Sequence, residues 1–162
     1  MSPEARYDLC HASFADLDAP TLYAILRLRS EVFVVEQNCV YLDPDGRDAE
    51  PGTRHIWIER AGAIRAYLRI LDDGEVPRIG RVVTAPDARG SGLAGTLVAE
   101  ALKVIGDRPS VLDAQAHLKN FYAKFGYEQT GPEFVEDGIP HIPMRKALLT
   151  GQDPTAAPQP VR

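Results

Sequence analysis

The sequence has few of the features that define several common protein classes. Of its 162 residues only two, Cys10 and Cys39, are cysteines. Two are too few for a disulfide scaffold, and their spacing matches no zinc motif. No window approaches the roughly 18 apolar residues of a membrane span, and the N-terminus lacks a cationic segment followed by an apolar run. We therefore expect a reduced, cytoplasmic protein without a metal, a membrane partner or an export signal.

Positive charge is also scarce. The chain has 18 Lys and Arg residues against 23 Asp and Glu residues, a formal net charge of -5. A sequence-independent nucleic-acid binder needs a basic face, so we expect no nucleic-acid partner. With 44% hydrophobic and 25% charged residues, the chain has the composition of one globular domain. We assign that domain to residues 1–149, and residues 150–162, rich in proline and poor in apolar residues, to a disordered tail.

What the sequence does have is a glycine-rich turn between a strand and a helix. Residues 79–84 are mostly β-branched, and Pro86 ends the strand that they predict. Gly90, Gly92 and Gly95 follow, before apolar residues at helical spacing. A helix N-terminus offers unpaired amides to an anion, and glycine leaves no side chain in the way. The turn therefore predicts a phosphate or pyrophosphate site, although an ordinary tight turn explains the glycines as well.

The three glycines satisfy the dinucleotide fingerprint G-x-G-x-x-G, with Asp113 about 20 residues further on, where an acid binds a ribose. An NAD-type dinucleotide-binding protein is therefore one alternative. Against it, residues 85–89 separate the strand from Gly90, whereas in the dinucleotide fold the first glycine nearly abuts the strand. The chain also has no triphosphate P-loop motif.

The order of the remaining elements also disfavours the dinucleotide fold. We predict strands over residues 7–14, 55–60, 62–71, 79–84, 111–112, 127–135 and 141–144, and helices from Asp18 to about Gln37 and over 91–106 and 116–125. Three successive strands before the glycine turn imply an antiparallel half-sheet, which a doubly wound fold lacks. We place Arg27, Arg29 and Glu31 on a solvated helix face. The acidic segment 38–52 is predicted to be a turn with Asx bonds.

A second pattern overlies the glycines. Arg89-x-x-Gly92-x-Ala94 resembles the R/Q-x-x-G-x-G/A loop that binds acetyl-CoA in the GNAT superfamily of N-acetyltransferases. Residues 120–127, Asn-Phe-Tyr-x-x-Phe-Gly-Tyr, resemble its second cofactor motif. Resemblance to the ElaA-like branch extends to segments at 28–37, 43–46, 114–117 and 136–141. It covers residues 7–148 and implies an α+β fold, a mixed, mostly antiparallel sheet flanked by helices, with splayed central parallel strands.

This resemblance implies an acetyl-CoA-dependent N-acetyltransferase that acts on a primary amine of a small molecule or peptide. Strands 79–84 and 110–114 are implied to hold the pantetheine arm, and amides 89–95 the pyrophosphate. The implied cofactor-binding residues are Val82, Val83, Thr84, Arg89, Gly90, Ser91, Gly92, Leu93, Ala94, Gly95, Asn120, Tyr122 and Phe125. The resemblance also implies that Tyr122 protonates the leaving thiolate, since a tyrosine hydroxyl has a pKa of about 10. Core packing of an aromatic ring is the alternative role for Tyr122.

The sequence does not decide which residue is the general base. In many GNAT enzymes a glutamate on the strand before the loop, or a chain of waters, accepts the amine proton, but here that strand carries Arg81. Glu36, His117 and His141 are candidates. The missing glutamate also keeps open a non-catalytic CoA-binding or regulatory module.

The acceptor side is equally open. Arg29, Arg81, Asp43 and Asp45 are candidates for lining it. An arginine there suits an acceptor with a carboxylate or phosphate, and a structural ion pair explains it as well. No residue names the acceptor, and nothing in the sequence decides between a monomer and a homodimer.

Overall fold

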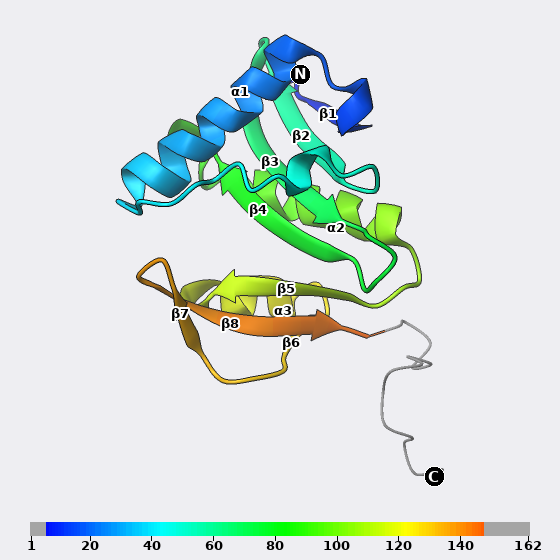
Figure 1. Cartoon of the computed structure of the whole chain (residues 1–162), viewed down its shortest axis with the longest axis vertical. Coiled ribbons are helices and arrows are strands. Elements are labelled where there is room, and N and C mark those ends of the chain that lie inside the picture. The colour runs from blue at the N-terminus through cyan, green and yellow to red at the C-terminus, as the bar shows by residue number, and fades with distance from the viewer. Residues whose placement is uncertain (1–5, 148–162) are drawn as a thin grey trace.

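The structure, a computed structural model, describes residues 6–147 and consists of one eight-stranded sheet with helices on both faces (Figure 1). The expected tail over residues 150–162 lies outside the described residues. The strands are β1 (Asp8–Ser13), β2 (Arg54–Arg60), β3 (Ala63–Leu71), β4 (Arg78–Thr84), β5 (Ser110–Gln115), β6 (Glu128–Gln129), β7 (Phe134–Glu136) and β8 (Ile139–Lys146). The main helices are α1 (Ala19–Arg29), the π-helix η3 (Ser30–Glu36), α2 (Leu93–Ile105) and α3 (Lys119–Ala123).

The sheet is mixed, with one parallel junction at its centre. Its strand order is β1-β2-β3-β4-β5-β8-β6, and β7 pairs with β8 at the side of this path. Every described pairing is antiparallel except that of β4 with β5, which have a single registered pair, Arg78 and Val111. Beyond that pair the two strands diverge toward their C-terminal ends (Figure 1). The predicted antiparallel half-sheet and splayed parallel strands are confirmed.

The two faces of the sheet pack against different helices because side chains alternate along a strand. Ile56 and Ile58 of β2 belong to the cluster that contains Leu97 of α2, and all three are fully buried. Trp57, between them, belongs to the cluster that contains Ile25 of α1. Burying an aliphatic side chain of this size contributes about 1.5–3 kcal/mol. The two clusters fix α1 on one face and α2 with α3 on the other.

The first helix spans the predicted range, but its second part has a different geometry. The side chain of Asp18 accepts a hydrogen bond from the Thr21 amide at 2.8 Å, which caps the N-terminus of α1. From Ser30 the helix continues as η3, a geometry that is rare in proteins and frequent at functional sites. The expectation of a solvated face is wrong for Arg29, which is fully buried. The reason is a set of ion pairs that Arg29 makes with the following loop.

The C-terminal part also departs from the prediction. The single strand expected over 127–135 is instead two short strands, β6 and β7, separated around Gly131 and Pro132, because proline cannot donate to a strand ladder. The helix expected from residue 116 begins as a 3-10 turn, Ala116–Leu118, before α3. The turn between β7 and β8 lies where expected, with positive φ angles of 50° at Asp137 and 77° at Gly138.

Candidate active site

The glycine turn leads into a helix N-terminus that no side chain of residues 6–147 caps. Gly92, the N-cap of α2, has a φ of 81°, and Gly90 has a φ of 83°, a left-handed region that favours glycine. A Cβ at either position would meet no atom within 4 Å, so the space beside the turn is open. The first amides of an α-helix have no partner within the helix. This turn can therefore bind an anion such as a pyrophosphate through its backbone.

A bulge interrupts β4 just before this turn. Val83 pairs with Tyr67 and Gly80 pairs with Arg69, so Arg81 and Val82 together oppose Leu68. Arg81 has a φ of 53°, unusual for a residue other than glycine. A bulge removes backbone groups from the regular ladder and redirects the strand. It lies in the region where β4 and β5 diverge.

A cavity of about 320 Å³ lies between these two strands. Gly80 and Val82 of β4 face Leu112 and Asp113 of β5 across it. The end of η3 and the segment after it form one wall, the β7–β8 hairpin contributes another, and α3 supplies one tyrosine. The lining residues from these parts are Phe33, Gln37, Cys39 and Tyr41, then Glu136, Asp137, Ile139 and His141, and Tyr122.

Tyr122 is buried and yet reaches this cavity. Its residue exposure is 4%, and its ring packs edge-on against Phe121 and Tyr127 at centroid distances of 4.9 and 6.2 Å. Within residues 6–147 its hydroxyl has no hydrogen-bond partner, whereas the hydroxyl of Tyr127 is 2.7 Å from that of Ser110. Burial raises the pKa of Tyr122, which keeps the hydroxyl protonated at neutral pH. The ring packs in the core and the hydroxyl is a proton donor available to a ligand.

Of the three candidate bases, only His141 lines the cavity. Its Nδ1 lies 2.7 Å from the carbonyl oxygen of Ile139. Because a carbonyl only accepts, Nδ1 carries the proton, and Nε2 of the neutral ring has a free lone pair. His117 is exposed on the turn before α3. Glu36 receives two hydrogen bonds from Arg89, which lower its pKa and make it a poor base.

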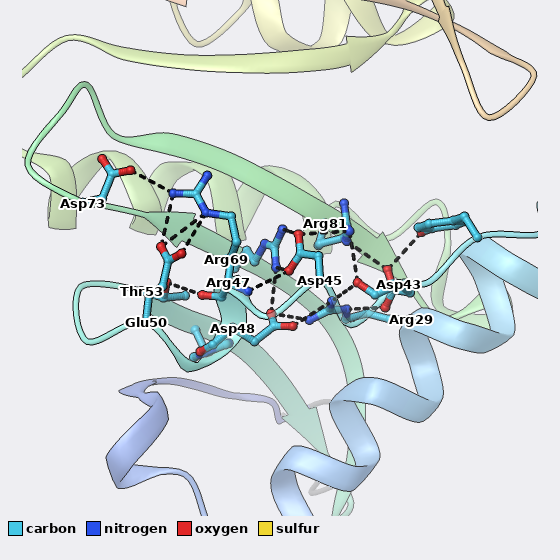
Figure 2. A network of polar contacts seen from close by, with 12 residues as sticks. Arg29, Asp43, Asp45, Arg47, Asp48, Glu50, Thr53, Arg69, Asp73 and Arg81 are labelled. Carbon is cyan, nitrogen blue, oxygen red and sulfur yellow. Dashed lines mark hydrogen bonds and ion pairs between the residues drawn. The ribbon is translucent and has the colours of Figure 1, made fainter.

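A chain of alternating charges joins α1, the segment after η3 and the strands β3 and β4 (Figure 2). Arg29 bonds to Asp43 at 2.8 Å and to Asp48 at 2.7 Å. Burial alone acts to lower the pKa of Arg29, but the hydrogen bond to Asp48 and nearby negative charge raise it overall. Arg69 bonds to Asp45 and Asp48 at 2.6 and 2.9 Å. These bonds hold the acidic segment after η3 against β3.

Arg81 completes this chain. It pairs with Asp43 at 2.9 Å and Asp45 at 3.4 Å, and its guanidinium lies 5.7 Å from the ring centroid of Tyr41. Of the four residues expected on the acceptor side, Arg81 and Asp45 line the cavity, whereas Arg29 and Asp43 are buried and do not line it. The Asx bond expected in this segment is present, since Asp45 accepts from the amide of Arg47.

Residues 34–148 match the family model of the acetyltransferase (GNAT) domain. The protein ElaA of Escherichia coli is 42% identical over 149 residues, which cover 88% of this chain and 95% of ElaA. This chain belongs to the GNAT acetyltransferase family. A UPF0039 protein of Mycobacterium tuberculosis is 50% identical over 134 residues, covering 80% of this chain and 86% of that protein.

Solved GNAT structures agree with this assignment. The crystal structure of an acyl-CoA N-acyltransferase from Pseudomonas aeruginosa has a TM-score of 0.83 and 43% identity, and covers 86% of this chain and 99% of that one. The crystal structure of E. coli ElaA has a TM-score of 0.82 and 40% identity, covering 87% and 99%. The resemblance to the GNAT superfamily and its ElaA-like branch is thereby confirmed. As a family member, the chain is an acyltransferase that uses an acyl-CoA.

The GNAT fold removes the basis for the dinucleotide alternative. A doubly wound fold places its fingerprint after the first strand of a parallel sheet, whereas here the turn follows β4, which is antiparallel to β3. Asp113 is paired with Arg78 at 3.1 Å across the diverging strands. The match of Gly90, Gly92 and Gly95 to that fingerprint is therefore coincidental.

The side chains of several predicted cofactor residues lie away from the cavity. Val83 and Leu93 are buried in the two clusters, so their side chains face the core. Phe125 packs on the helix, because a Cβ built on Gly95 would lie 3.7 Å from its ring. Asn120 is exposed and does not line the cavity.

Among the described residues, no helix is long and apolar enough to cross a membrane.

Sequence reasoning missed Arg69, Asp48 and His55. Arg69 lies between apolar residues in the second half of β3, after Leu68 and before Ile70, which was an available signal. His55 is fully buried, and its ring nitrogens lie 2.7 Å from the hydroxyl of Tyr67 and 3.0 Å from the carbonyl oxygen of Asp48. No sequence spacing predicts these contacts, because the sheet register brings the partners together.

Proposed function

We propose that this protein transfers an acetyl group from acetyl-CoA directly to a primary amine of a small molecule or peptide. The observation that carries the proposal is Tyr122, a buried side chain whose protonated hydroxyl has no partner in the described chain and which lines a cavity between two splayed strands. Because this hydroxyl opens onto the cavity, a ligand bound there can accept its hydrogen bond.

The residues fit the acyl-CoA that the family uses. The uncapped N-terminus of α2 and the glycines before it suit a pyrophosphate, and we assign amides 89–95 to it. The bulged strand leaves backbone groups near Arg81 and Val82 outside the β3–β4 ladder, so we assign residues 82–84 to the pantetheine arm. Asn120 and Phe125 complete the proposed set from α3 and the turn after it. We assign Tyr122 to the junction between these parts and the acceptor side.

An acyl-CoA supplies an activated acyl group and a thiolate leaving group. Tyr122 holds a proton at its hydroxyl for that leaving group. We assign Nε2 of His141 to accept the proton that the attacking amine loses, either directly or through one water. Each transfer therefore consumes one proton at Tyr122 and deposits one at His141, so proton exchange with solvent restores both residues.

Two measurements test this proposal. Calorimetry compares acetyl-CoA with NAD, and we expect micromolar affinity for acetyl-CoA and no binding of NAD. Thiol release is then followed with a panel of polyamines, amino acids, aminoglycosides and peptide N-termini. Binding of acetyl-CoA without thiol release above hydrolysis would favour the non-catalytic CoA-binding module. Binding of NAD alone would contradict the proposal.

A further inference from the structure

The arginines that line the cavity carry no free positive charge. Each of them is paired with at least one carboxylate at 2.6–3.4 Å. The pairs are Arg47 with Glu50 and Asp73, Arg69 with Asp45 and Asp48, Arg78 with Asp113, and Arg81 with Asp43 and Asp45. An acceptor with a carboxylate or phosphate would have to compete with these existing partners.

The opposite wall carries free negative charge. Glu136 and Asp137 line the cavity at the turn of the β7–β8 hairpin, and neither has an ion pair with any residue of the described chain. The positive φ angles of Asp137 and Gly138 define this turn. The thiol of Cys39 lies 3.2 Å from the carbonyl oxygen of Asp137, which joins the hairpin to the segment after η3. The two carboxylates are therefore held at the edge of the cavity.

A second observation points to a ligand in this cavity. The Tyr122 hydroxyl reaches it from a residue that is 4% exposed, and it has no partner among residues 6–147. The hydroxyl opens onto the cavity, so a ligand bound there can be its hydrogen-bond partner.

We propose that the amine acceptor is a small diamine or polyamine. One amine, near His141, loses its proton and reacts, while a second stays protonated between the carboxylates of Glu136 and Asp137. The inference rests on the proposed function, since it names the acceptor of the same site. A volume of about 320 Å³ suits a small molecule. Opposite charges at such a rim attract a dication and repel an amine that carries a carboxylate.

The test compares three ligands of similar length: 1,4-diaminobutane, n-butylamine and 4-aminobutyrate. Calorimetry measures each of them against the full chain saturated with CoA, and steady-state kinetics gives KM with acetyl-CoA. We expect the diamine to bind at least about ten-fold more tightly than butylamine, with 4-aminobutyrate weakest. Equal affinity for the diamine and the monoamine, or preference for the amino acid, would overturn the inference.

The matched variants are Glu136→Gln with Asp137→Asn, and Asp107→Asn with Glu128→Gln. Both pairs remove two exposed carboxylates, but the second pair lies outside the cavity. Asn tolerates the positive φ of position 137, so the turn is preserved. The first pair should abolish the preference for the diamine, with CoA affinity unchanged, and the second should keep it. Retention of the preference in the first pair would overturn the role of the hairpin.

These readouts separate the inference from the proposed function. Failure of acetyl-CoA to bind, or of any amine to be acetylated, contradicts the proposed function. Calorimetry with the diamine tests the charge argument independently of turnover. If the diamine binds through Glu136 and Asp137 but is not acetylated, the cavity binds diamines, and the proposal that a diamine is the acceptor is overturned.

Discussion

Arg89 donates hydrogen bonds to both carboxylate oxygens of Glu36 at 2.6 and 2.8 Å. This bidentate pair joins the end of the π-helix η3 to the glycine turn before α2, two segments 53 residues apart in sequence. It places a carboxylate beside the proposed pyrophosphate site and gives Glu36 a lowered pKa. We therefore propose that Glu36 is a neighbour of the cofactor side rather than a base.

The variant Glu36→Gln separates these two roles. We expect kcat to change by less than about two-fold, because Glu36 accepts no substrate proton, and acetyl-CoA affinity to shift by no more than about three-fold, because exposed ion pairs are weak. Steady-state kinetics and calorimetry measure both. A loss of kcat of about 100-fold with intact CoA binding would restore Glu36 as the general base.

Replacement of the proposed acid, Tyr122→Phe, should lower kcat by roughly 10- to 1,000-fold and leave acetyl-CoA affinity within a few-fold. The ring keeps its packing while the proton donor is lost. Tyr127→Phe is the matched control. The ring of Tyr127 packs against that of Tyr122, and its hydroxyl is hydrogen-bonded to Ser110. The control should lose about 1 kcal/mol of stability and little turnover. Full activity of Tyr122→Phe would contradict the role of Tyr122 as the acid and leave it a packing role alone.

Removal of the proposed base, His141→Gln, should lower kcat by roughly 100-fold at neutral pH, because glutamine cannot accept the amine proton. Activity should recover partly at higher pH, where more of the amine is already deprotonated. His117→Gln, on an exposed turn, serves as the control and should behave as the wild type. Equal activity of the two variants would direct the search for the base to a water chain.

The buried guanidinium of Arg29 should be essential for folding. Arg29→Met removes one of two cationic partners from each of Asp43 and Asp48, which keep Arg81 and Arg69, so the loss should be at most the roughly 3–5 kcal/mol of a broken buried pair. Arg27→Met, on the exposed side of the same helix, should change stability by less than about 0.5 kcal/mol. Urea unfolding measures both. A small effect at Arg29 would show that the carboxylates are protonated or reach water.

Stability should fall as the pH drops below about 6.5. Burial lowers the pKa of His55 from its ordinary value of 6.5, so the unfolded chain binds a proton in a range where the folded chain does not. Protonation therefore favours the unfolded state. Melting temperatures between pH 7.5 and 5.5 test this above the range in which Asp48 titrates, because the pKa of Asp48 is lowered from 3.8.

A variant isolates the contribution of His55. His55→Phe should be less stable than the wild type at every pH, since the bonds to Tyr67 and Asp48 are lost. It should nevertheless lose most of the pH dependence between 7.5 and 5.5, and His11→Gln, an exposed control, should retain it. A slope unchanged in His55→Phe would assign the effect to another group.

The sequence by itself determined the family, the order of the elements and the glycine turn. These features depend on local chemistry: β-branched strands, the cap at Asp18, and glycines at positions 90 and 92 that adopt positive φ. The motif residues around Tyr122 were readable for the same reason, since they lie within one short helix and its flanks. Such local patterns do not depend on the tertiary contacts of the segment.

Only the tertiary structure decided which side chains share the cavity. Arg29 looked like part of a solvated helix face, yet it is fully buried because Asp43 and Asp48, 14 and 19 residues away, fold back onto it. Likewise, the splay of β4 from β5 brings Tyr122, His141 and the carboxylates of the β7–β8 hairpin to one cavity. Burial and charge pairing between distant segments depend on strand register and helix packing, which no local spacing encodes.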